Sequence, residues 1–513
     1  MVSIRFGILW NDGAAGRVAP RGRVWVEVNR PAERGEAGAV RAKPRLDERQ
    51  ILIVGAGPAG LGVVHRLCEL GFHNYLLADA ASHPGGLSSS FTDSLGFTWD
   101  IGGHVLFSHY PYFDRLMDDL LGDEWLSHRR EAWIWLKDRF VPYPFQHNIR
   151  YLPESDMREC FEGLARAAQG RPHAAPANFE EWILASFGEG IARHFLLPYN
   201  AKVWTYPART LSFRWIGERV AEVDLNRVAG IIQEDRDDGD WGPNNTFRFP
   251  RKGGTGEIWR RLAARLPAGN MVYGKRLTRL ETASRTVSFE DGSREKYDLL
   301  VSTAPLDLLI QHSDLGHLAG AAAELKHSST NVVGIGLKGA PPPHLREKCW
   351  IYFPQPEIPF YRATVFSNYS PFNVPDPSAF WSLILEVSES PVKPVEHARL
   401  VDSVIAGLLA ARLIASPSEI VDVWTYRAEY GYPTPSLNRD AALGAIHSQL
   451  EELGIFSRGR FGGWKYEVAN QDHSLMQGVE LVDRLAEGTE ETTFRIPACT
   501  PQPADGTLFP PRT

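Results

Sequence analysis

The sequence predicts an α/β fold, in which a discontinuous Rossmann-like nucleotide-binding domain is interrupted by a helical insert domain and a mostly antiparallel β-sheet domain. Three observations predict it. Residues 50–79 have the pattern of a strand, a glycine-rich turn, a helix and a second strand. Residues 154–200 show helical periodicity. Short alternating segments within residues 332–387 indicate antiparallel strands.

The first strand–helix–strand unit has the strongest local pattern. Ile51–Val54 is an apolar, mostly β-branched run, which is typical of a strand buried on both faces. A glycine-rich turn leads into a helix that we expect to run to Leu70 and to end at Gly71. Residues 75–78 form the second predicted strand, which Asp79 ends.

Later segments supply the other domains. Residues 111–127 and 154–200 are predicted to be helical, with a connector at 172–176. Segments 350–353, 363–366 and 381–387 are predicted strands. A strand at 299–301 and a helix at 477–485 indicate returns to the first domain. The predicted division is a poorly ordered extension at 1–49, a nucleotide-binding domain at 50–128, 245–310 and 455–500, a helical domain at 150–215, and a sheet domain at 129–149, 216–244 and 311–454.

Composition excludes several classes of protein. The 513 residues are 43% hydrophobic and 23% charged, which excludes disorder for most of the chain. The 55 basic and 62 acidic side chains give a net charge of −7, which argues against nucleic acid as the main partner. Cys68, Cys160, Cys349 and Cys499 are scattered, so they indicate ordinary thiols and no disulfide or zinc framework.

No segment predicts a membrane span or an export signal. The longest apolar stretches, residues 51–64 and 404–413, are shorter than the ~20 residues that a spanning helix needs. We therefore expect a cytoplasmic protein with no membrane partner. Residues 1–49 hold ten basic and six acidic residues, and we interpret them as an extension or a start-site artefact. The acidic residues argue against a transit peptide.

The glycine-rich turn predicts a dinucleotide site. Gly55, Gly57 and Gly60 lie between a strand and a helix, where glycines permit a tight turn and the approach of a pyrophosphate to the helix start. Asp79 follows Gly60 by 19 residues, where a carboxylate can accept from both ribose hydroxyls. That carboxylate would repel a 2′-phosphate, so NADP is disfavoured in this pocket.

Two further glycine clusters extend the predicted site. They are Gly85, Gly86, Leu87 and Ser88, and then Gly102, Gly103 and His104. Successive loops without side chains imply an extended ligand such as FAD. Here the sequence resembles the FAD-containing amine-oxidase-like superfamily, whose later FAD contacts match residues 302–305 and the helix near 477. The resemblance makes the discontinuous domain an FAD-binding domain, and adds Arg460, Asn470, Gln471 and Asp472 as cofactor-binding residues.

Longer motifs narrow the resemblance. They include residues 103–110, 141–148, 198–204, 215–220, 241–244, 349–354, 360–364, 431–435 and 459–473. Together they resemble the UDP-galactopyranose mutases of the eukaryotic type, in order from about residue 50 to 485. The implied substrate is a nucleotide sugar.

Two arginines are candidate diphosphate ligands. Arg219 and Arg362 stand far apart in aromatic, otherwise uncharged surroundings, and a guanidinium offers bidentate donors to phosphate. The alternative is that each makes a structural ion pair, Arg219 with Glu218 for example. The resemblance favours the diphosphate role, and it adds Tyr352, Tyr432, Tyr466 and Asn470 as substrate-binding residues.

The resemblance also implies a uridine pocket, formed by Phe107, Tyr143, Gln146, Asn200 and Trp204. Aromatic faces stack on a base, and amides hydrogen-bond to its edge. The chain departs from the family at Leu196 and Leu197, where members can carry Met-Arg, and any contact of that arginine is missing here.

Three residues are implied to face the sugar and the flavin: Trp350, Asn244 and His104. We interpret His104 as a support for the isoalloxazine geometry. A catalytic histidine with a carboxylate partner is the alternative. The sequence shows no metal-ligand cluster and no paired catalytic carboxylates, which suggests that the cofactor supplies the chemistry.

The implied reaction interconverts UDP-galactopyranose and UDP-galactofuranose, a precursor of cell-surface glycans, through a covalent adduct between N5 of reduced flavin and the anomeric carbon. It involves no net redox change. NADPH or NADH would reduce the FAD, with Arg130 at a position used for the nicotinamide nucleotide, and Ala132 in place of a family serine. Residues 238–245 have the composition of a lid or of a plain surface loop. A mutase for another nucleotide sugar and an amine-oxidase-like oxidoreductase are the alternatives. The oligomeric state is undetermined.

Overall fold

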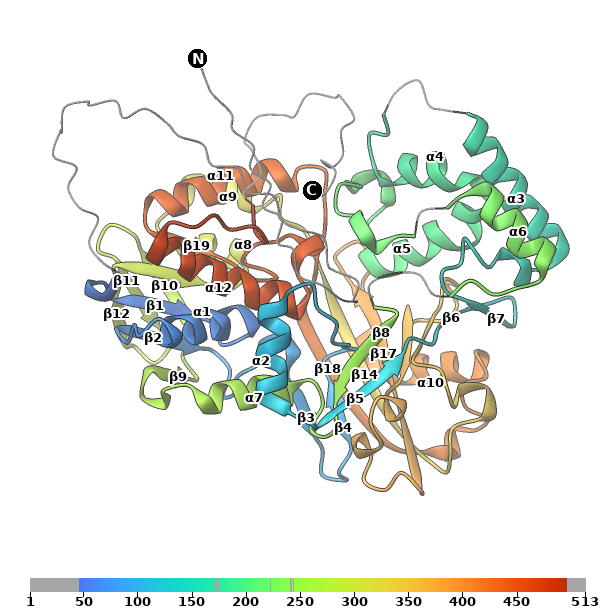
Figure 1. The fold of residues 1–513 in the computed structure, drawn as a ribbon, viewed down its shortest axis with the longest axis horizontal. Coiled ribbons are helices and arrows are strands. Elements are labelled where there is room, and N and C mark those ends of the chain that lie inside the picture. Colours follow the sequence, from blue (N-terminus) through green and yellow to red (C-terminus); the bar gives the residue numbers. More distant parts are fainter. Residues whose placement is uncertain (1–45, 171–174, 222, 240–241, 243, 496–513) are drawn as a thin grey trace, which may run out of the picture. The chain divides into compact units, whose positions relative to one another are not determined.

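A five-stranded parallel sheet carries the nucleotide-binding turn in the computed structural model, which describes residues 46–170, 175–221, 223–239, 242 and 244–495. The strand order is β19-β13-β1-β2-β9, with every pairing parallel (Figure 1). The strands are short runs from distant parts of the chain: β1 (Ile51–Val54), β2 (Tyr75–Asp79), β9 (Met271–Tyr273), β13 (Leu299–Ser302) and β19 (Ile455–Ser457). This confirms the discontinuous Rossmann-like fold.

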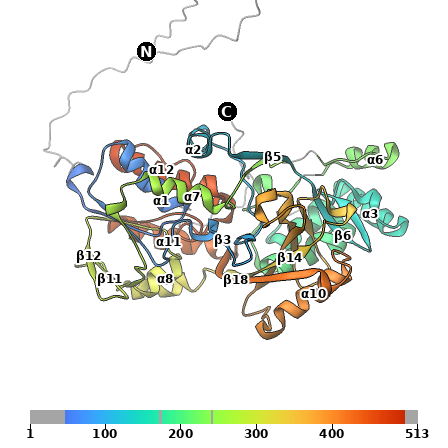
Figure 2. The ribbon, with the colours of Figure 1, turned by 90° about the horizontal axis from the view of Figure 1, so that it is seen from below.

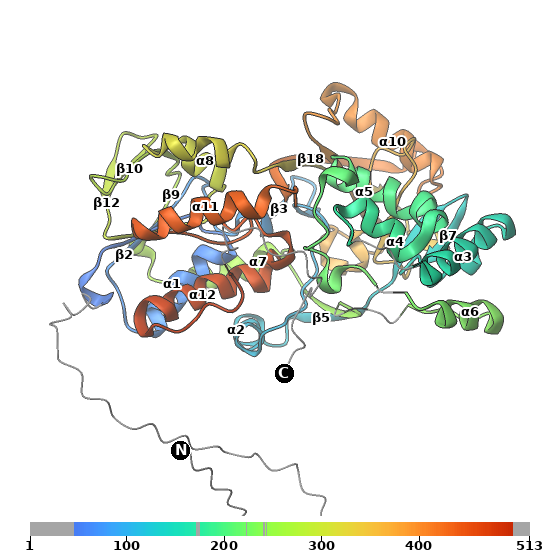
Figure 3. The same ribbon diagram turned by 90° about the horizontal axis from the view of Figure 1, so that it is seen from above.

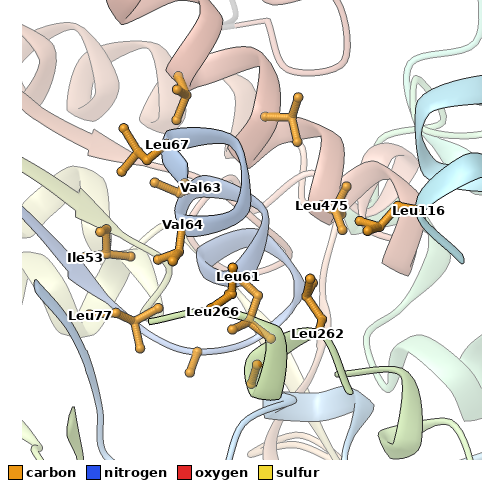
Figure 4. Packing of buried hydrophobic residues seen from close by; sticks show 14 of the residues in the cluster. Ile53, Leu61, Val63, Val64, Leu67, Leu77, Leu116, Leu262, Leu266 and Leu475 are labelled. Carbon is orange, nitrogen blue, oxygen red and sulfur yellow. The ribbon is translucent and has the colours of Figure 1, made fainter. Parts of the chain in front are cut away.

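Helices from both ends of the chain cover one face of this sheet. They are α1 (Pro58–Glu69), α12 (Gln471–Glu487), α7 (Gly256–Arg265) and α2 (Pro111–Leu121). Figure 4 shows Leu61 of α1 and Leu475 of α12 in the same apolar core. Two glycines let α1 and α12 touch, because a Cβ on Gly62 would lie 2.5 Å from the Leu475 carbonyl oxygen and one on Gly478 would lie 2.3 Å from that of Ala59.

A second core covers the other face, because alternate residues of a strand point to opposite sides. Its helices are α8 (Leu306–Gln311), α9 (Ala319–Ala322) and α11 (Arg439–Glu452), and its small antiparallel sheet is β10 (Leu277–Glu281), β11 (Thr286–Phe289) and β12 (Arg294–Lys296). Figure 2 shows α1, α7 and α12 on one side, and α8 with β11 and β12 on the other.

A seven-stranded sheet forms the predicted antiparallel part, in the order β18-β14-β17-β16-β15-β6-β7. Only the β15–β6 pair is parallel. The strands are β6 (Ala132–Leu136), β7 (Arg139–Pro142), β14 (His327–Lys338), β15 (Trp350–Tyr352), β16 (Arg362–Val365), β17 (Phe380–Glu389) and β18 (Ile420–Pro433). Helix α10 (Leu400–Ala410) packs in the core beside it, and two small strand pairs are β3 (Ser90–Thr92) with β4 (Thr98–Asp100) and β5 (Trp125–Arg129) with β8 (Thr246–Pro250).

The helical part consists of α3 (Glu154–Gln169), α4 (Phe179–Ile191), α5 (Leu197–Trp204) and α6 (Leu225–Glu234). Figure 3 shows α3, α4 and α5 gathered beside β7. A π-helical turn at Ala192–Leu196 joins α4 to α5. Glycines bring α3 and α4 into backbone contact, since a Cβ on Gly190 would lie 2.6 Å from the Cys160 Cα.

One predicted helix is too long. The helix expected at 111–127 ends at Leu121, because Gly122 has a φ of +52° and turns the chain. Residues 125–129 instead form β5, which pairs with β8. A half-buried strand position suits Trp125 better than a continued polar helix end.

The predicted domain boundaries stay a prediction, since all described residues belong to one compact unit. Most of the expected N-terminal extension, residues 1–45, lies outside the described residues, as do 496–500 of the predicted nucleotide-binding domain. Within the described part of the chain, no helix is both long enough and apolar enough to cross a bilayer.

Candidate active site

A cavity of about 630 Å³ lies where the carboxyl ends of β1 and β2 meet the large sheet. Strands β14, β16, β17 and β18 contribute to its wall, as do the loops at 101–107, 459–461 and 466–474. It brings together most of the residues predicted from the sequence: Gly55, Gly57, Asp79, Gly86, Leu87, Ser88, Gly102, Gly103, His104, Phe107, Arg219, Asn244, Arg362, Tyr432, Arg460, Tyr466, Asn470 and Gln471.

The turn after β1 is built for a pyrophosphate. Gly55 has a φ of +108°, and Gly60 lies so close to the Gly55 carbonyl oxygen that a Cβ there would approach it to 1.9 Å. The first turn of α1 leaves the Ala59 and Gly60 amides without intrahelical acceptors, at the positive end of the helix dipole. Gly86 packs directly against Gly57, since a Cβ on Gly86 would lie 3.2 Å from the Gly57 Cα, and both glycines line the cavity.

Asp79 lies at the carboxyl end of β2 and lines the same cavity. Its carboxylate accepts from the Ala56 amide at 2.5 Å and from the Ala81 amide at 2.6 Å. Burial raises the pKa of Asp79, against the effect of these two amides. The second lone pair of each oxygen remains available to a ribose diol. Together with the glycine turn, this arrangement fits the adenosine and pyrophosphate parts of FAD.

Two predicted cofactor glycines support this turn without lining the cavity. Gly60 allows α1 to pack against the strand end, and Gly85 donates its amide to the Ala56 carbonyl at 2.9 Å. Sequence reasoning missed two basic neighbours of Asp79, Lys275 and Arg276, which line the cavity after β9. The Lys275 amide donates to the Asp79 carbonyl oxygen at 2.7 Å.

The loop at 102–104 presents backbone and one imidazole to the cavity. His104 Nδ1 is buried and has no hydrogen-bond partner within the described residues. Burial lowers the pKa of His104 to about 4, so the ring is neutral at pH 7. No carboxylate of the described residues hydrogen-bonds to it, which favours a geometric role over acid–base catalysis.

Arg362 has a carboxylate partner, which its sequence surroundings do not reveal. Glu386 lies directly opposite it on the neighbouring strand β17. The Arg362 guanidinium donates from Nε at 3.1 Å and from Nη2 at 2.7 and 2.8 Å. Arg362 therefore makes the ion pair that was the alternative from the sequence, with a partner 24 positions away that it meets through strand pairing. Both still line the cavity.

Arg219 and Arg460 are held differently. Arg219 donates to the Glu467 carbonyl oxygen at 2.9 Å and lies 4.5 Å from the centre of the Tyr466 ring. The Glu218 side chain, its predicted alternative partner, lies outside what the structure describes. Arg460 donates to the carbonyl oxygens of Gly431 and Ala469, and burial lowers its pKa. Neither guanidinium meets a carboxylate of the described residues, so this part of the cavity is positively charged.

Most residues predicted to bind uridine lie behind the cavity wall. Phe107 lines the cavity. Trp204 is 1% exposed and packs edge-on against the rings of Tyr432 and Tyr466, which do line it. Asn200 accepts from Trp204 Nε1 at 3.1 Å.

The other predicted substrate residues outside the wall lie in the same layer. Gln146 is buried and donates to the Ala221 carbonyl oxygen at 2.8 Å. Tyr143 and Tyr352 have ring centres 5.6 Å apart, and Trp350 lies next to Tyr352 at 6.5 Å.

Asn244 is oriented by Arg130. Arg130 is 5% exposed, and it donates to Asn244 Oδ1 at 2.6 Å and to the Gly239 carbonyl oxygen at 2.9 Å. Because the amide oxygen accepts from Arg130, the amide nitrogen is left for the cavity that Asn244 lines. Of the predicted lid at 238–245, residues 240, 241 and 243 lie outside the described residues.

A buried lysine fixes the chain before Arg362. Lys202 of α5 donates to the carbonyl oxygens of Gln355, Ile358 and Phe360 at 2.6 to 2.9 Å. Burial lowers its pKa to about 7. It ties the helix that carries Asn200 to the segment that leads into β16.

Two side-chain groups have the composition of metal ligands. One is His109, Asp472 and His473, and the other is an Asp156, Glu159 and His194 group. In the first, His109 Nδ1 lies 2.6 Å from Asp472 Oδ2, the length of a direct hydrogen bond. Asp472 therefore tethers the 103–110 loop to α12, and it does not line the cavity.

The fold and this site define a flavoprotein. A family model described as flavin containing amine oxidoreductase matches residues 58–440, and the chain belongs to that family. A crystal structure of reduced UDP-galactopyranose mutase is 48% identical in sequence, with a TM-score of 0.85 over 87% of this chain and 95% of that one. The chain is therefore a member of the UDP-galactopyranose mutases, an isomerase of that type, which confirms the resemblance.

More distant similarities concern the fold or a short segment. A putrescine oxidase bound to putrescine has a TM-score of 0.57 and 17% identity, over 85% of this chain and 98% of that chain. A 15-cis-phytoene desaturase from Glycine max is 36% identical over 92 residues, which span 17% of this chain and 16% of the desaturase.

Proposed function

We propose that the chain binds FAD in this cavity and interconverts UDP-galactopyranose and UDP-galactofuranose. The observation that carries the proposal is the placement of Arg219, Arg362 and Arg460 in one cavity with the dinucleotide turn. When bound and reduced, FAD supplies N5 as a nucleophile toward the anomeric carbon, and it ends each cycle in the oxidation state in which it began. The similarity to a reduced UDP-galactopyranose mutase supports this.

The residues of the chain would bind and neutralise the diphosphate. Arg219 keeps Nε and Nη1 free of hydrogen bonds to other described residues, and Arg362 keeps Nη1 free in the same sense. Burial raises the pKa of Tyr352 and of Tyr432. Both phenols therefore stay protonated at neutral pH, and that of Tyr432, which lines the cavity, can donate to phosphate oxygens.

Retention of UDP would be the main electrostatic task of the site. The C1–O bond of the sugar breaks, and its electron pair leaves on UDP. The bond between C1 and the ring oxygen would then open, with that oxygen taking up a proton, and the 4-hydroxyl would close the smaller ring on C1 as it loses its proton. A phosphate oxygen of the retained UDP would then return to C1. Positive charge in the cavity stabilises the leaving diphosphate, and its retention keeps recombination intramolecular.

The uridine end and the reductant remain proposals from the resemblance. Phe107 would stack on the base, with Tyr143, Gln146, Asn200 and Trp204 shaping the pocket behind it. NADPH or NADH would reduce the flavin. Arg130 already hydrogen-bonds to Asn244 and Gly239, which supports a role in holding that loop over direct contact with a nicotinamide nucleotide. A cytoplasmic location stays a prediction from the sequence.

Product analysis tests the proposed reaction. UDP-galactofuranose is incubated anaerobically with the FAD-loaded protein, with and without NADPH or dithionite, and the nucleotide sugars are separated by chromatography. We expect equilibration to UDP-galactopyranose only with reductant, and we expect the flavin to remain reduced throughout turnover. Stoichiometric oxidation of a substrate by the oxidised flavin would instead establish an amine-oxidase-like oxidoreductase.

A second nucleotide sugar is the specific alternative. Leu196 is 5% exposed in the helical core, and its carbonyl oxygen accepts from Asn200 at 2.8 Å. A leucine pair here removes a charge from the neighbourhood of the predicted base pocket. A panel of nucleotide sugars with the reduced protein tests this, and faster conversion of another sugar would replace UDP-galactose as the substrate.

A further inference from the structure

Glu386 is an acidic residue in the middle of an apolar strand. It lies on β17, between β14 and β16, and it is 1% exposed. Its neighbours on the strand, Leu385 and Val387, are buried in the apolar core beside the sheet. A carboxylate at such a position costs free energy unless it is paired and hydrogen-bonded.

Three residues from two parts of the chain donate to this carboxylate. The Gly103 amide donates to Oε1 at 2.6 Å. Arg362 donates from Nε and Nη2, and the Tyr361 hydroxyl donates to Oε2. The glycine loop fits closely against it, because Gly102 has a φ of +97° and a Cβ there would lie 2.9 Å from Oε1.

The hydrogen bonds keep Glu386 ionised. Burial alone would raise its pKa, but Arg362, Tyr361 and the Gly103 amide outweigh burial and hold the pKa of Glu386 below its usual value. One ionised carboxylate, paired with Arg362, therefore stands in the wall of the cavity that Arg219 and Arg460 also line.

The pairing also decides which side of Arg362 can reach a ligand. The Nε–Nη2 edge of the guanidinium faces Glu386, and within the described residues Nη1 has no protein acceptor. Arg362 therefore cannot offer its Nε–Nη2 fork to a phosphate while this pair holds, but it presents Nη1 in a fixed direction.

We propose that Glu386 is a positioning residue that links the flavin loop at 102–104 to Arg362, so that the loop and the diphosphate ligand take one relative position. The inference rests on the proposed function for the identity of the diphosphate. Glu386 does so through its two oxygens, with Oε1 shared by Gly103 and Arg362, and Oε2 shared by Tyr361 and Arg362.

Glu386→Gln tests this, because it keeps the shape and removes the charge. We expect the variant to retain FAD and to lose kcat at least tenfold, with KM changed by less than threefold. We also expect a more positive reduction potential of the bound flavin, since a negative charge has left the cavity wall. A defect of packing alone would not move the potential in that direction.

Glu389→Gln is the matched control. Glu389 lies on the same strand and accepts from Asn331, Arg427 and His397, but it does not line the cavity. Because Glu389 and Arg427 are more exposed than Glu386 and Arg362, we expect a smaller loss of stability, with kcat and flavin potential unchanged. If Glu386→Gln gives the same kcat and potential as Glu389→Gln, the proposal is overturned.

A double-mutant cycle with Arg362→Met shows whether Glu386 acts through Arg362. We expect Glu386→Gln to reduce kcat no further in the Arg362→Met background. Additive losses would overturn the link to Arg362. If Glu386→Gln alone does not fold, the test is made with the double variant Glu386→Gln/Arg362→Met, in which both charges of the pair are absent. Retention of FAD with the same turnover as Arg362→Met supports the link. Loss of FAD refutes it.

The proposed function can fail separately. If wild-type protein does not convert UDP-galactofuranose when reduced, the proposed function is wrong. In that case, the link between Glu386 and Arg362 can still be tested without turnover. FAD content and flavin reduction potential are then measured for Glu386→Gln, Arg362→Met and the double variant. An unchanged potential in Glu386→Gln would then overturn the link.

Discussion

Arg219, Arg362 and Arg460 line one cavity, and they are held in two different ways. Arg362 is neutralised by a carboxylate, whereas Arg219 and Arg460 each donate to backbone carbonyl oxygens and lie over tyrosine rings. A guanidinium paired with a carboxylate contributes direction more than charge, whereas the other two contribute charge. Substitutions at Arg219 and Arg362 should therefore differ in stability even where they agree in activity.

Arg362→Ala should abolish most activity and also destabilise the fold. The variant leaves Glu386 buried without its charge partner, a situation that costs about 3–5 kcal/mol. Arg219→Ala loses a hydrogen bond to Glu467, a longer one to Asn470 and one cation–π contact, together worth about 1–2 kcal/mol. We expect each to lower kcat by about 100-fold or more, because each removes a donor to the leaving diphosphate.

Thermal denaturation and steady-state kinetics check both variants together. If Arg362→Ala were as stable as Arg219→Ala, the ion pair with Glu386 would have no energetic role. Near-normal turnover of either variant would remove that arginine from the diphosphate site.

Single residues set the limit of what could be predicted from the sequence. The glycines and Asp79 were predictable because their spacing along the chain is the signal. Glu386 was not, since its partner is assigned by strand register. Its one local sign is an acid within the apolar run of β17. Lys202 likewise meets three carbonyl oxygens more than 150 positions away, which no local pattern records.

At the scale of elements, the contact of β1 with α1 depends on the absence of a side chain. Gly60→Ala would place a Cβ 1.9 Å from the Gly55 carbonyl oxygen, a backbone atom that cannot move without opening the turn. We expect loss of FAD binding, measured by the flavin absorbance of the purified protein.

Gly230→Ala is the matched control for Gly60→Ala. Gly230 lies in α6, and a Cβ there meets nothing within 4 Å. Helix propensity predicts that this variant gains about 1 kcal/mol and keeps its FAD. Equal FAD content in both variants would show that the turn tolerates a side chain.

The segment after α12 is a second element-scale test. Glu491 accepts from Arg458, which is 1% exposed, and from Arg484. The Phe494 ring lies against the Arg458 guanidinium, with 4.4 Å between the ring centre and the guanidinium carbon. Glu491→Gln should destabilise the protein by about 3 kcal/mol, the lower end of the range for breaking a buried pair, because Glu451 still contacts Arg458.

Urea unfolding measures this change. Glu490→Gln is the control, since Glu490 lies 3.9 Å from an Arg495 that is exposed. A shift for Glu491→Gln no larger than that of the control would mean that this segment does not stabilise the fold.

At the scale of the whole molecule, buried neutral histidines predict acid sensitivity. Burial lowers the pKa of His104 and of His327 to about 4, and it holds that of His447 well below the ordinary value of 6.5. The unfolded chain therefore binds more protons between pH 6.5 and 4. Stability falls as pH falls through that window, by up to about 1.4 kcal/mol per pH unit for each histidine.

His447→Leu isolates one contribution. Both ring nitrogens of His447 are buried without a partner among the described residues, so the variant should be at least as stable at pH 7. Its stability should also depend less on pH between 6.5 and 4. Exposed His73 provides the control His73→Gln. Identical pH slopes of the free energy of unfolding in all three proteins would contradict this account.

The overall fold was predictable from the sequence to a greater extent than the layout of the site. The β1–α1–β2 pattern and the alternation near β17 are local signals, and the fold class they predict is confirmed. The end of α2 was misplaced because helical periodicity continued past Gly122. That Trp204 stands behind Tyr432 and Tyr466 required the packing of α5 against distant segments.

The position of α12 has a consequence for how the protein is made. The dinucleotide turn at 55–60 is translated well before β13, β19 and α12, which complete its sheet and cover α1. A nascent chain therefore contains the glycine-rich motif of the cofactor site long before the elements that complete the site have been synthesised. FAD capture should therefore be a late event in synthesis, and chains released before α12 should leave the ribosome colourless.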